Sequence, residues 1–160
     1  MKLAIVSIGK LKGDAEAVLV RRYGERLDAL ARQTSLGPLT SIEISESRSQ
    51  SANERRKQEA EALLARCPPG FLLVPLDERG GLITSDEFAG RLRGWRDAGT
   101  PGVAFAIGGA DGHGAGVLEA AALTLSLGRM TLPHGMARAV LVEQLYRAAT
   151  IIAGHPYHRA

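Results

Sequence analysis

The side chains best suited to chemistry lie near the end of the chain, where guanidinium, imidazole and phenol groups follow one another. Arg147 stands in a helix-length stretch, and residues 155–159 read His-Pro-Tyr-His-Arg. Chain ends are usually weakly ordered. A tail rich in tyrosine, histidine and arginine is an exception to this and is expected to bind a specific partner. Arginine and histidine suit an anionic, planar partner, and the tail therefore indicates nucleic acid.

Positive charge is concentrated in the same part of the chain. Over the whole sequence the net charge is only +3, which is mild for a protein that binds nucleic acid without specificity. From residue 129 to residue 160 the acid Glu143 stands alone against four arginines, Arg129, Arg138, Arg147 and Arg159. The excess of positive charge thus sits at one end.

Length and composition predict one domain over residues 1–160, which is large enough to bury a hydrophobic core without the support of disulfides or metals. Cys67 is the only cysteine, which excludes an intrachain disulfide and a thiolate metal cluster. The apolar run after Met1 is too short for a signal peptide, and no run reaches membrane-spanning length. We therefore expect a cytoplasmic protein with no membrane partner.

Strand and helix patterns alternate along the chain. These elements must position the arginine, histidine and tyrosine side chains of the C-terminal part. Apolar runs predict strands at 3–9, 39–44, 71–76, 103–107 and 123–127. Helical patterns cover 14–32, opened by Asp14 as a cap, then 54–66, 85–97, 117–122 and 135–153. Pro75 suggests that its strand ends nearby or lies at an edge, and the polar stretch 45–53 predicts a mobile loop. This order predicts an α/β fold with a mostly parallel sheet flanked by helices.

In such sheets ligands gather beyond the carboxyl ends of the strands, here at 76–77, 107–109 and 127–128. The loop 108–116 holds five glycines in nine residues and could cradle a phosphate. However, Val117 stands where the third glycine of a dinucleotide fingerprint would be, and no P-loop lysine follows. A plain strand-to-helix turn is the simpler interpretation, with His113 facing solvent.

Two other sites are disfavoured by spacing. His155 and His158 could bind a metal, but no third ligand lies nearby in the sequence, so no metal is expected. No Gly-x-Ser-x-Gly elbow supports a serine nucleophile. The helix 135–153 is apolar over much of its surface, so it lies either in a large core or against a second copy of the chain. Glu143 and Arg147, four residues apart, would form an ion pair on this helix.

Three C-terminal segments resemble a known family. Residues 130–134 (Met-Thr-Leu-Pro-His), 143–148 (Glu-Gln-Leu-Tyr-Arg-Ala) and 156–158 (Pro-Tyr-His) are similar to the signature of the pseudouridine N3-methyltransferases of the ribosomal large subunit, in the SPOUT class. Residues 1–3, Gly9-Lys10 and 107–112 (Ile-Gly-Gly-x-x-Gly) match the same family in order. The resemblance covers the whole chain and is weakest from 33 to 66.

The resemblance implies a C-terminal deep trefoil knot, a rare exception to unknotted topology, and a homodimer that binds S-adenosyl-L-methionine. Family contacts to this cofactor fall on Leu76, Gly108, Gly109, Leu127, Gly128, Arg129, Met130, Thr131, Leu132 and Pro133. The implied substrate is a pseudouridine in an intersubunit hairpin loop of 23S rRNA, modified on the assembled ribosome, with no DNA or metal partner. Alternatives are a SPOUT enzyme for another rRNA or tRNA nucleotide, or a ribosome-binding protein without turnover.

Roles in the tail follow as hypotheses. Arg147 would stabilise charge on the uracil ring or hold a phosphate, and Tyr157 would stack on a splayed base. His158 is the best general base by its intrinsic pKa, or else a phosphate contact. The residues Arg138, His155 and Arg159 are expected to contact RNA. For His134, a role in fixing the preceding loop or in a dimer contact is as good an explanation as a role in catalysis.

Overall fold

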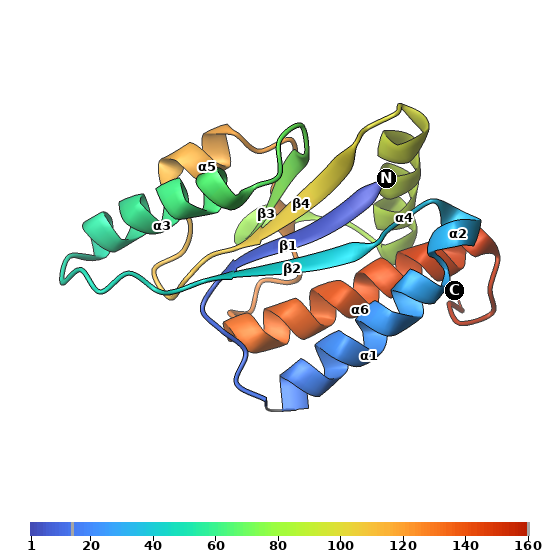
Figure 1. The fold of residues 1–160 in the computed structure, drawn as a ribbon, viewed down its shortest axis with the longest axis horizontal. Helices are drawn as coiled ribbons and strands as arrows, with labels where there is room; N and C mark the ends of the chain where they lie inside the picture. The colour runs from blue at the N-terminus through green and yellow to red at the C-terminus, as the bar shows by residue number, and fades with distance from the viewer. Residues whose placement is uncertain (14, 160) are drawn as a thin grey trace.

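A five-stranded sheet lies between two layers of helices in the computed structural model, which describes residues 1–13 and 15–159 (Figure 1). Asp14, the expected helix cap, lies outside the described residues. The strands are β1 (Lys2–Ile8), β2 (Leu39–Ile44), β3 (Leu72–Leu82), β4 (Gly102–Ile107) and β5 (Leu125–Ser126). The helices are α1 (Ala15–Ala29), α2 (Ala31–Thr34), α3 (Ala52–Arg66), α4 (Ser85–Asp97), α5 (Ala115–Glu119) and α6 (His134–Ala153).

The strand order is β2-β1-β4-β3-β5, and every described pair is parallel. The predicted parallel α/β fold flanked by helices is therefore confirmed. β4 is buried along its whole length and β1 from its second residue on, because helices cover both faces of the sheet. This burial explains why both strands read as continuous apolar runs rather than alternating ones.

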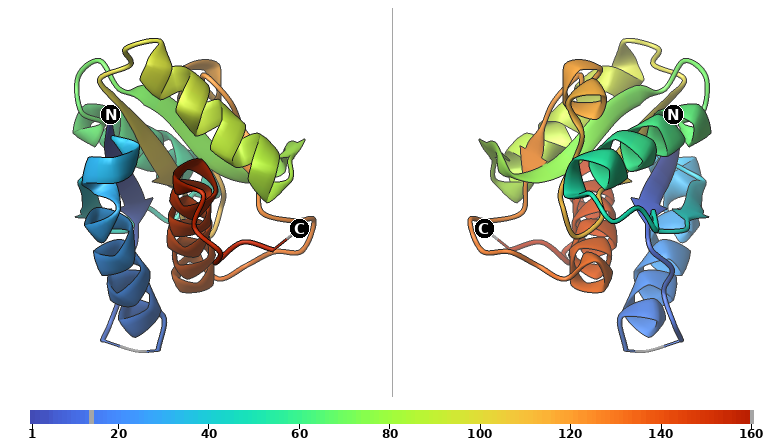
Figure 2. Two further views of the ribbon diagram at one scale, coloured as in Figure 1. Left: turned by 90° about the vertical axis from the view of Figure 1, so that its right-hand side faces the viewer. Right: turned by 90° about the vertical axis from the view of Figure 1, so that its left-hand side faces the viewer.

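The helix α6 lies between α1 and α4 on one face of the sheet (Figure 2). Its residues Leu141, Val142, Leu145 and Ala149 are buried within this one chain. The large-core alternative thus accounts for much of the apolar surface of α6. On the other face, α3 and α5 pack together and cover the side chains of Val6 and Ile8.

Two predictions about β3 and its neighbours need correction. β3 continues to Leu82 rather than ending near Pro75. The alternative prediction, an edge position, holds locally, because Pro75 aligns with Ala106 of β4 on one side and β5 pairs with β3 only from Leu76 on. β5 is only two residues long, shorter than the predicted strand 123–127. No helix within the described residues is long and apolar enough to cross a membrane.

Candidate functional site

Leu76 in the middle of β3, the carboxyl end of β4 and the start of β5 meet at one edge of the sheet. Leu76 aligns with Ile107 of β4 on one side and with Leu125 of β5 on the other. The fold therefore brings Leu76, the glycines that follow Ile107 and the start of the loop 127–133 to one place. These segments carry all the residues expected to contact a cofactor.

His113 lies at this edge and does not face solvent as expected. Its Nε2 is 3.0 Å from the carbonyl oxygen of Leu76, which only accepts, so Nε2 carries the proton. Nδ1 is buried and has no partner among the described residues. Burial lowers the pKa of His113 below its usual 6.5, which favours the neutral ring. A Cβ on Gly108 would lie 3.3 Å from this ring, so the glycine makes room for it.

The loop 127–133 presents backbone groups that a ligand could use. Gly128 has φ 143°, a conformation that favours glycine, and its N–H donates to Oγ of Ser126 at 3.2 Å. No described residue accepts a hydrogen bond from the N–H groups of residues 129–132. The side chains of residues 129–133 are exposed. Free donors on a glycine-anchored loop suit binding of a small polar molecule.

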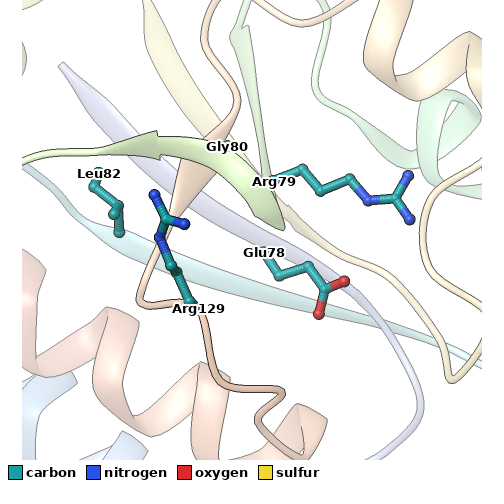
Figure 3. A pocket seen from close by; sticks show the side chains of 5 residues that line it. All are labelled: Glu78, Arg79, Gly80, Leu82 and Arg129. Atoms are coloured by element: carbon teal, nitrogen blue, oxygen red, sulfur yellow. The ribbon is translucent and has the colours of Figure 1, made fainter.

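A pocket of about 390 Å³ adjoins this loop (Figure 3). Arg129 reaches from the loop toward Leu82, while Glu78 and Arg79 come from the far end of β3. Oγ1 of Thr131 donates to Oε2 of Glu78 at 3.3 Å and ties the loop to this end. The extension of β3 beyond Pro75 thus forms one wall beside the loop.

The C-terminal tail is organised around the carboxylate of Glu143. Its Oε1 accepts from Nε and Nη2 of Arg147, at 3.1 and 2.6 Å, and from the hydroxyl of Tyr157 at 3.0 Å. Its Oε2 accepts from Nε2 of Gln144 at 2.7 Å. The predicted Glu143–Arg147 ion pair is therefore present. The Arg147 guanidinium also lies 4.9 Å from the centre of the Tyr157 ring, within cation–π range.

His158 completes the cluster on the side of α4. Nη1 of Arg147 is 3.4 Å from its Nδ1, and because arginine only donates, Nδ1 accepts and Nε2 carries the proton. Nε2 lies 3.3 Å from Oδ2 of Asp86, in the first turn of α4, without hydrogen-bond geometry. In this arrangement the basic nitrogen of His158 is engaged with Arg147. A role as general base requires that contact to open.

The ring of Tyr157 is tucked against α6. Its centre lies 4.7 Å from that of Tyr146. Burial, followed by Tyr23 and Glu143, raises the pKa of Tyr157 well above its usual range. The phenol therefore stays protonated and donates, and stacking on a base would require the ring to leave Tyr146.

The three expected RNA contacts behave differently. Arg138 is 0% exposed, with Nη1 2.5 Å from Oε1 of Glu43 and Nη2 3.1 Å from the carbonyl of Gly9. The expectation that Arg138 contacts RNA is wrong, because α6 turns it toward the ends of β1 and β2. His155 and Arg159 are exposed, and their contact with RNA stays a prediction.

Glu43 and Glu143 are the residues that sequence reasoning missed. Glu43 lies ninety-five residues before Arg138 and gave no local signal, whereas Glu143 was visible only as an i,i+4 partner. The ring of His134 packs on Gly9, where a Cβ would lie 3.2 Å from it, which fits a role in fixing the loop.

The two parts of the site do not touch within one chain. The loop 127–133 precedes α6 and the tail follows it, and no hydrogen bond or salt bridge between described residues joins them. In the part of the chain that the structure describes, no three His, Cys, Asp or Glu side chains are grouped as metal ligands would be. Nδ1 of His155 accepts from the Tyr157 N–H at 3.2 Å instead.

Comparison with known proteins shows similarity along the whole chain. A family model described as "Predicted SPOUT methyltransferase" matches residues 1–158. Ribosomal RNA large subunit methyltransferase H of Xanthobacter autotrophicus is 48% identical over 160 residues, covering 100% of both chains. The protein of that name from Rhodopseudomonas palustris strain CGA009 is 49% identical, again over 100% of both. The solved SpoU methyltransferase AviRb of Streptomyces viridochromogenes is 16% identical with a TM-score of 0.43, covering 91% of this chain and 57% of that one, a likeness too slight to support an inference.

Proposed function

The chain belongs to the SPOUT methyltransferase family, and we propose that it methylates N3 of a pseudouridine in 23S rRNA, with S-adenosylmethionine as the methyl donor. One observation carries the proposal: relatives that match the chain from end to end bear the name ribosomal RNA large subunit methyltransferase H. The choice of pseudouridine N3 rests on the resemblance of residues 130–134, 143–148 and 156–158 to that family's signature.

The edge formed by β3, β4 and β5 fits a donor site. We assign the binding of S-adenosylmethionine to Leu76, Gly108 and Gly109 and to the backbone of the loop 127–133. Support comes from the free N–H groups of residues 129–132 and from the buried, unpartnered Nδ1 of His113 beside Gly108. When bound, S-adenosylmethionine supplies a methyl group on a positively charged sulfur. The side chains of Arg129 and Met130 are exposed, so their part in binding is assigned to the backbone.

The tail is assigned to the nucleotide. In the reaction N3 gains a bond to the methyl carbon as the carbon–sulfur bond breaks, and the N3 proton must leave. Arg147 would stabilise negative charge on the ring as that proton departs. His158 would accept the proton once its Nδ1 is released from Arg147, while protonated Tyr157 would hold a base by stacking. Glu143 keeps Arg147 and Tyr157 in place until RNA binds.

We further propose that the enzyme is a homodimer with a C-terminal trefoil knot that acts on assembled ribosomes in the cytoplasm. The loop 127–133 and the tail lie at separate places in one chain, which favours a dimer in which the two come together. Apolar side chains around this loop support a contact surface: Met130 is 84% exposed, and Leu132 and Met136 are exposed as well. The modest net charge favours recognition of an assembled particle over naked RNA.

The test is transfer of labelled methyl from S-adenosylmethionine to ribosomes that lack the modification. Intact ribosomes are compared with separated subunits, naked rRNA and tRNA, and the product nucleoside is identified by mass spectrometry. N3-methylpseudouridine from intact ribosomes alone is the expected result. A Tyr157→Ala variant that still binds S-adenosylmethionine serves as the inactive control.

Two outcomes would redirect the proposal. Label on naked rRNA or on tRNA would keep the methyltransferase and replace the substrate with another nucleotide. Ribosome binding without any methyl transfer would indicate a binding protein that has retained the fold.

A further inference from the structure

One arginine of α3 holds two loops that are far apart in the sequence. Nε and Nη2 of Arg55 donate to the two carboxylate oxygens of Asp111, at 2.6 and 3.0 Å. Nη1 donates to the carbonyls of Ser49 and Gln50, at 2.9 and 3.0 Å. The guanidinium thus joins the serine segment (residues 45–51) to the glycine turn (residues 108–114). The serine segment, expected to be mobile, is tied to α3.

Glu59, one turn further along α3, binds the serine segment and lies beside the glycine turn. Its side chain is buried, with the residue 6% exposed, and Oε1 accepts from the N–H of Ser47 at 2.9 Å. Oε2 has no hydrogen-bond partner among the described residues and lies 2.6 Å from where a Cβ on Gly109 would be. A Cβ on Gly114 would lie 2.7 Å from the carbonyl of Arg56. At Gly114 a Cβ would meet the backbone of α3, so glycine is required there, whereas at Gly109 a Cβ would have to displace the carboxylate end of Glu59.

The composition of the glycine turn makes such support necessary. Gly112 has φ 78°, and the neighbouring glycines restrict the backbone little, so the isolated turn would populate many conformations. A bidentate pair with a carboxylate fixes both distance and orientation. The Asp111 carboxylate beside Arg55 accepts these bonds as an anion, and the guanidinium lowers the pKa of Asp111. The turn is thus ordered from α3 before any ligand arrives.

We propose that Arg55, through Asp111, positions Gly108 and Gly109 and so sets the affinity for the methyl donor. Arg55 is then a positioning residue that touches neither the donor nor the RNA. The inference rests on the proposed function, because it takes the glycine turn as part of the S-adenosylmethionine site. Without this contact, donor binding would include the entropy cost of ordering the turn.

The experiment is calorimetric titration of S-adenosylmethionine into the wild-type protein, Arg55→Gln, Asp111→Asn and the double variant. Each single substitution is expected to raise Kd about tenfold, and the double variant no further, because both remove the same contact. The kcat at saturating donor is expected to stay within about twofold of wild type, so that the effect falls on KM. Arg55→Lys, which keeps charge but not the bidentate geometry, should bind with intermediate affinity.

Arg96→Gln is the matched control. Arg96, in the last turn of α4, pairs with Asp97 and donates to the carbonyl of Thr34 at 2.7 Å. Its loss removes a similar partly exposed ion pair away from the glycine turn and should leave Kd unchanged. If Arg55→Gln fails to fold, Asp111→Asn, which preserves the side-chain shape, carries the test.

The outcomes separate the two claims. Wild-type binding with an unchanged Kd in both single variants would overturn this inference and leave the proposed function standing. Additive losses in the double variant, or a fall in kcat with Kd unchanged, would also overturn it. Failure of the wild-type protein to bind S-adenosylmethionine would overturn the proposed function and this inference with it.

Discussion

The hydroxyl of Tyr157 and the carboxylate of Glu143 are joined by a hydrogen bond of 3.0 Å across fourteen residues. Because Glu143 Oε1 also accepts from Arg147, one oxygen holds both the tail and the guanidinium nearest to it. In the free chain, the Tyr157 ring and the Arg147 guanidinium, which are assigned to RNA, are therefore held against α6. RNA must replace these contacts with its own when it binds.

Substitutions at Tyr157 separate the ring from the hydroxyl. Tyr157→Ala is expected to abolish methylation with the Kd for S-adenosylmethionine within about twofold of wild type, because the donor contacts lie elsewhere. Tyr157→Phe keeps the ring and loses one hydrogen bond, about 1 kcal/mol, so activity should fall by less than about tenfold. Methyl transfer and calorimetry measure both effects. Donor affinity that falls in step with activity would move the tail into the cofactor site.

Arg147→Lys tests the need for a planar guanidinium. A lysine ammonium cannot bond to Glu143 at two nitrogens and also reach His158. We expect kcat to fall by about 100-fold, with little change in the KM for the donor. Arg26→Lys is the control, because Arg26 lies 5.6 Å from the Tyr23 ring in the same aromatic cluster. Single-turnover methyl transfer that is equally slow in both variants would argue against a specific role for Arg147.

His113 gives the free energy of unfolding a pH dependence of predictable sign. Burial lowers its folded-state pKa below 6.5, so the unfolded chain binds more protons as the pH falls below that value. Wild-type stability should therefore decline from about pH 6.5 to pH 5 more steeply than that of His113→Gln. The folded chain also lowers the pKa of three carboxyls, Glu43, Glu87 and Asp111. The stability that they contribute is lost only at lower pH, as the pH falls below their ordinary pKa values near 4. Urea unfolding at several pH values measures the difference, and parallel curves would contradict it.

Glu43→Gln should leave the buried Arg138 without its ionised partner. Breaking a buried pair destabilises strongly, and because the Glu43 side chain is 30% exposed we expect about 2–4 kcal/mol. Arg138→Met combined with Glu43→Gln should recover part of this loss, since no buried charge remains. Urea denaturation gives both numbers. A double variant less stable than Glu43→Gln alone would contradict this prediction and show that Arg138 also stabilises through its bond to the carbonyl of Gly9.

Gly80→Ala tests the contact that defines β5. A Cβ at Gly80 would lie 2.7 Å from the backbone carbonyl carbon of Leu125, so the strands must move apart, at about 1–3 kcal/mol. Donor affinity should fall too, because the loop 127–133 follows β5 directly. Gly90→Ala, in α4 with open space around it, should stabilise by about 0.5–1 kcal/mol and leave Kd unchanged. Thermal unfolding and calorimetry distinguish the two glycines.

Local patterns predicted the order of the elements, although the predicted helix 14–32 is divided into α1 and α2 and the predicted helix 117–122 begins at Ala115. The predicted bounds of β2 and α4 agree with the structure, in which a capping box of Thr84 and Glu87 begins α4. The predicted strand end at Ile107 is confirmed, whereas Leu76, predicted at a strand end, lies within β3 beside it.

Contacts between distant segments could not be predicted in this way. Charge alone predicts that Arg138 contacts RNA like the other arginines, whereas its burial depends on Glu43 of β2. The position of His113 in a glycine-rich loop predicts exposure to solvent, yet the glycines let its ring reach the carbonyl of Leu76. In each case the partner lies in a strand that is distant in the sequence, and the spacing of residues does not predict such a contact.

The position of α6 has a consequence for how the chain folds. α1 is made early and packs on α6, but the whole stretch from Ala29 to His134 is synthesised between them. Such non-local packing slows folding, and the apolar face of α1 stays uncovered until α6 is available. The segment that completes the core also carries Glu143 and Arg147, so a nascent or truncated chain without α6 is expected to be both aggregation-prone and inactive.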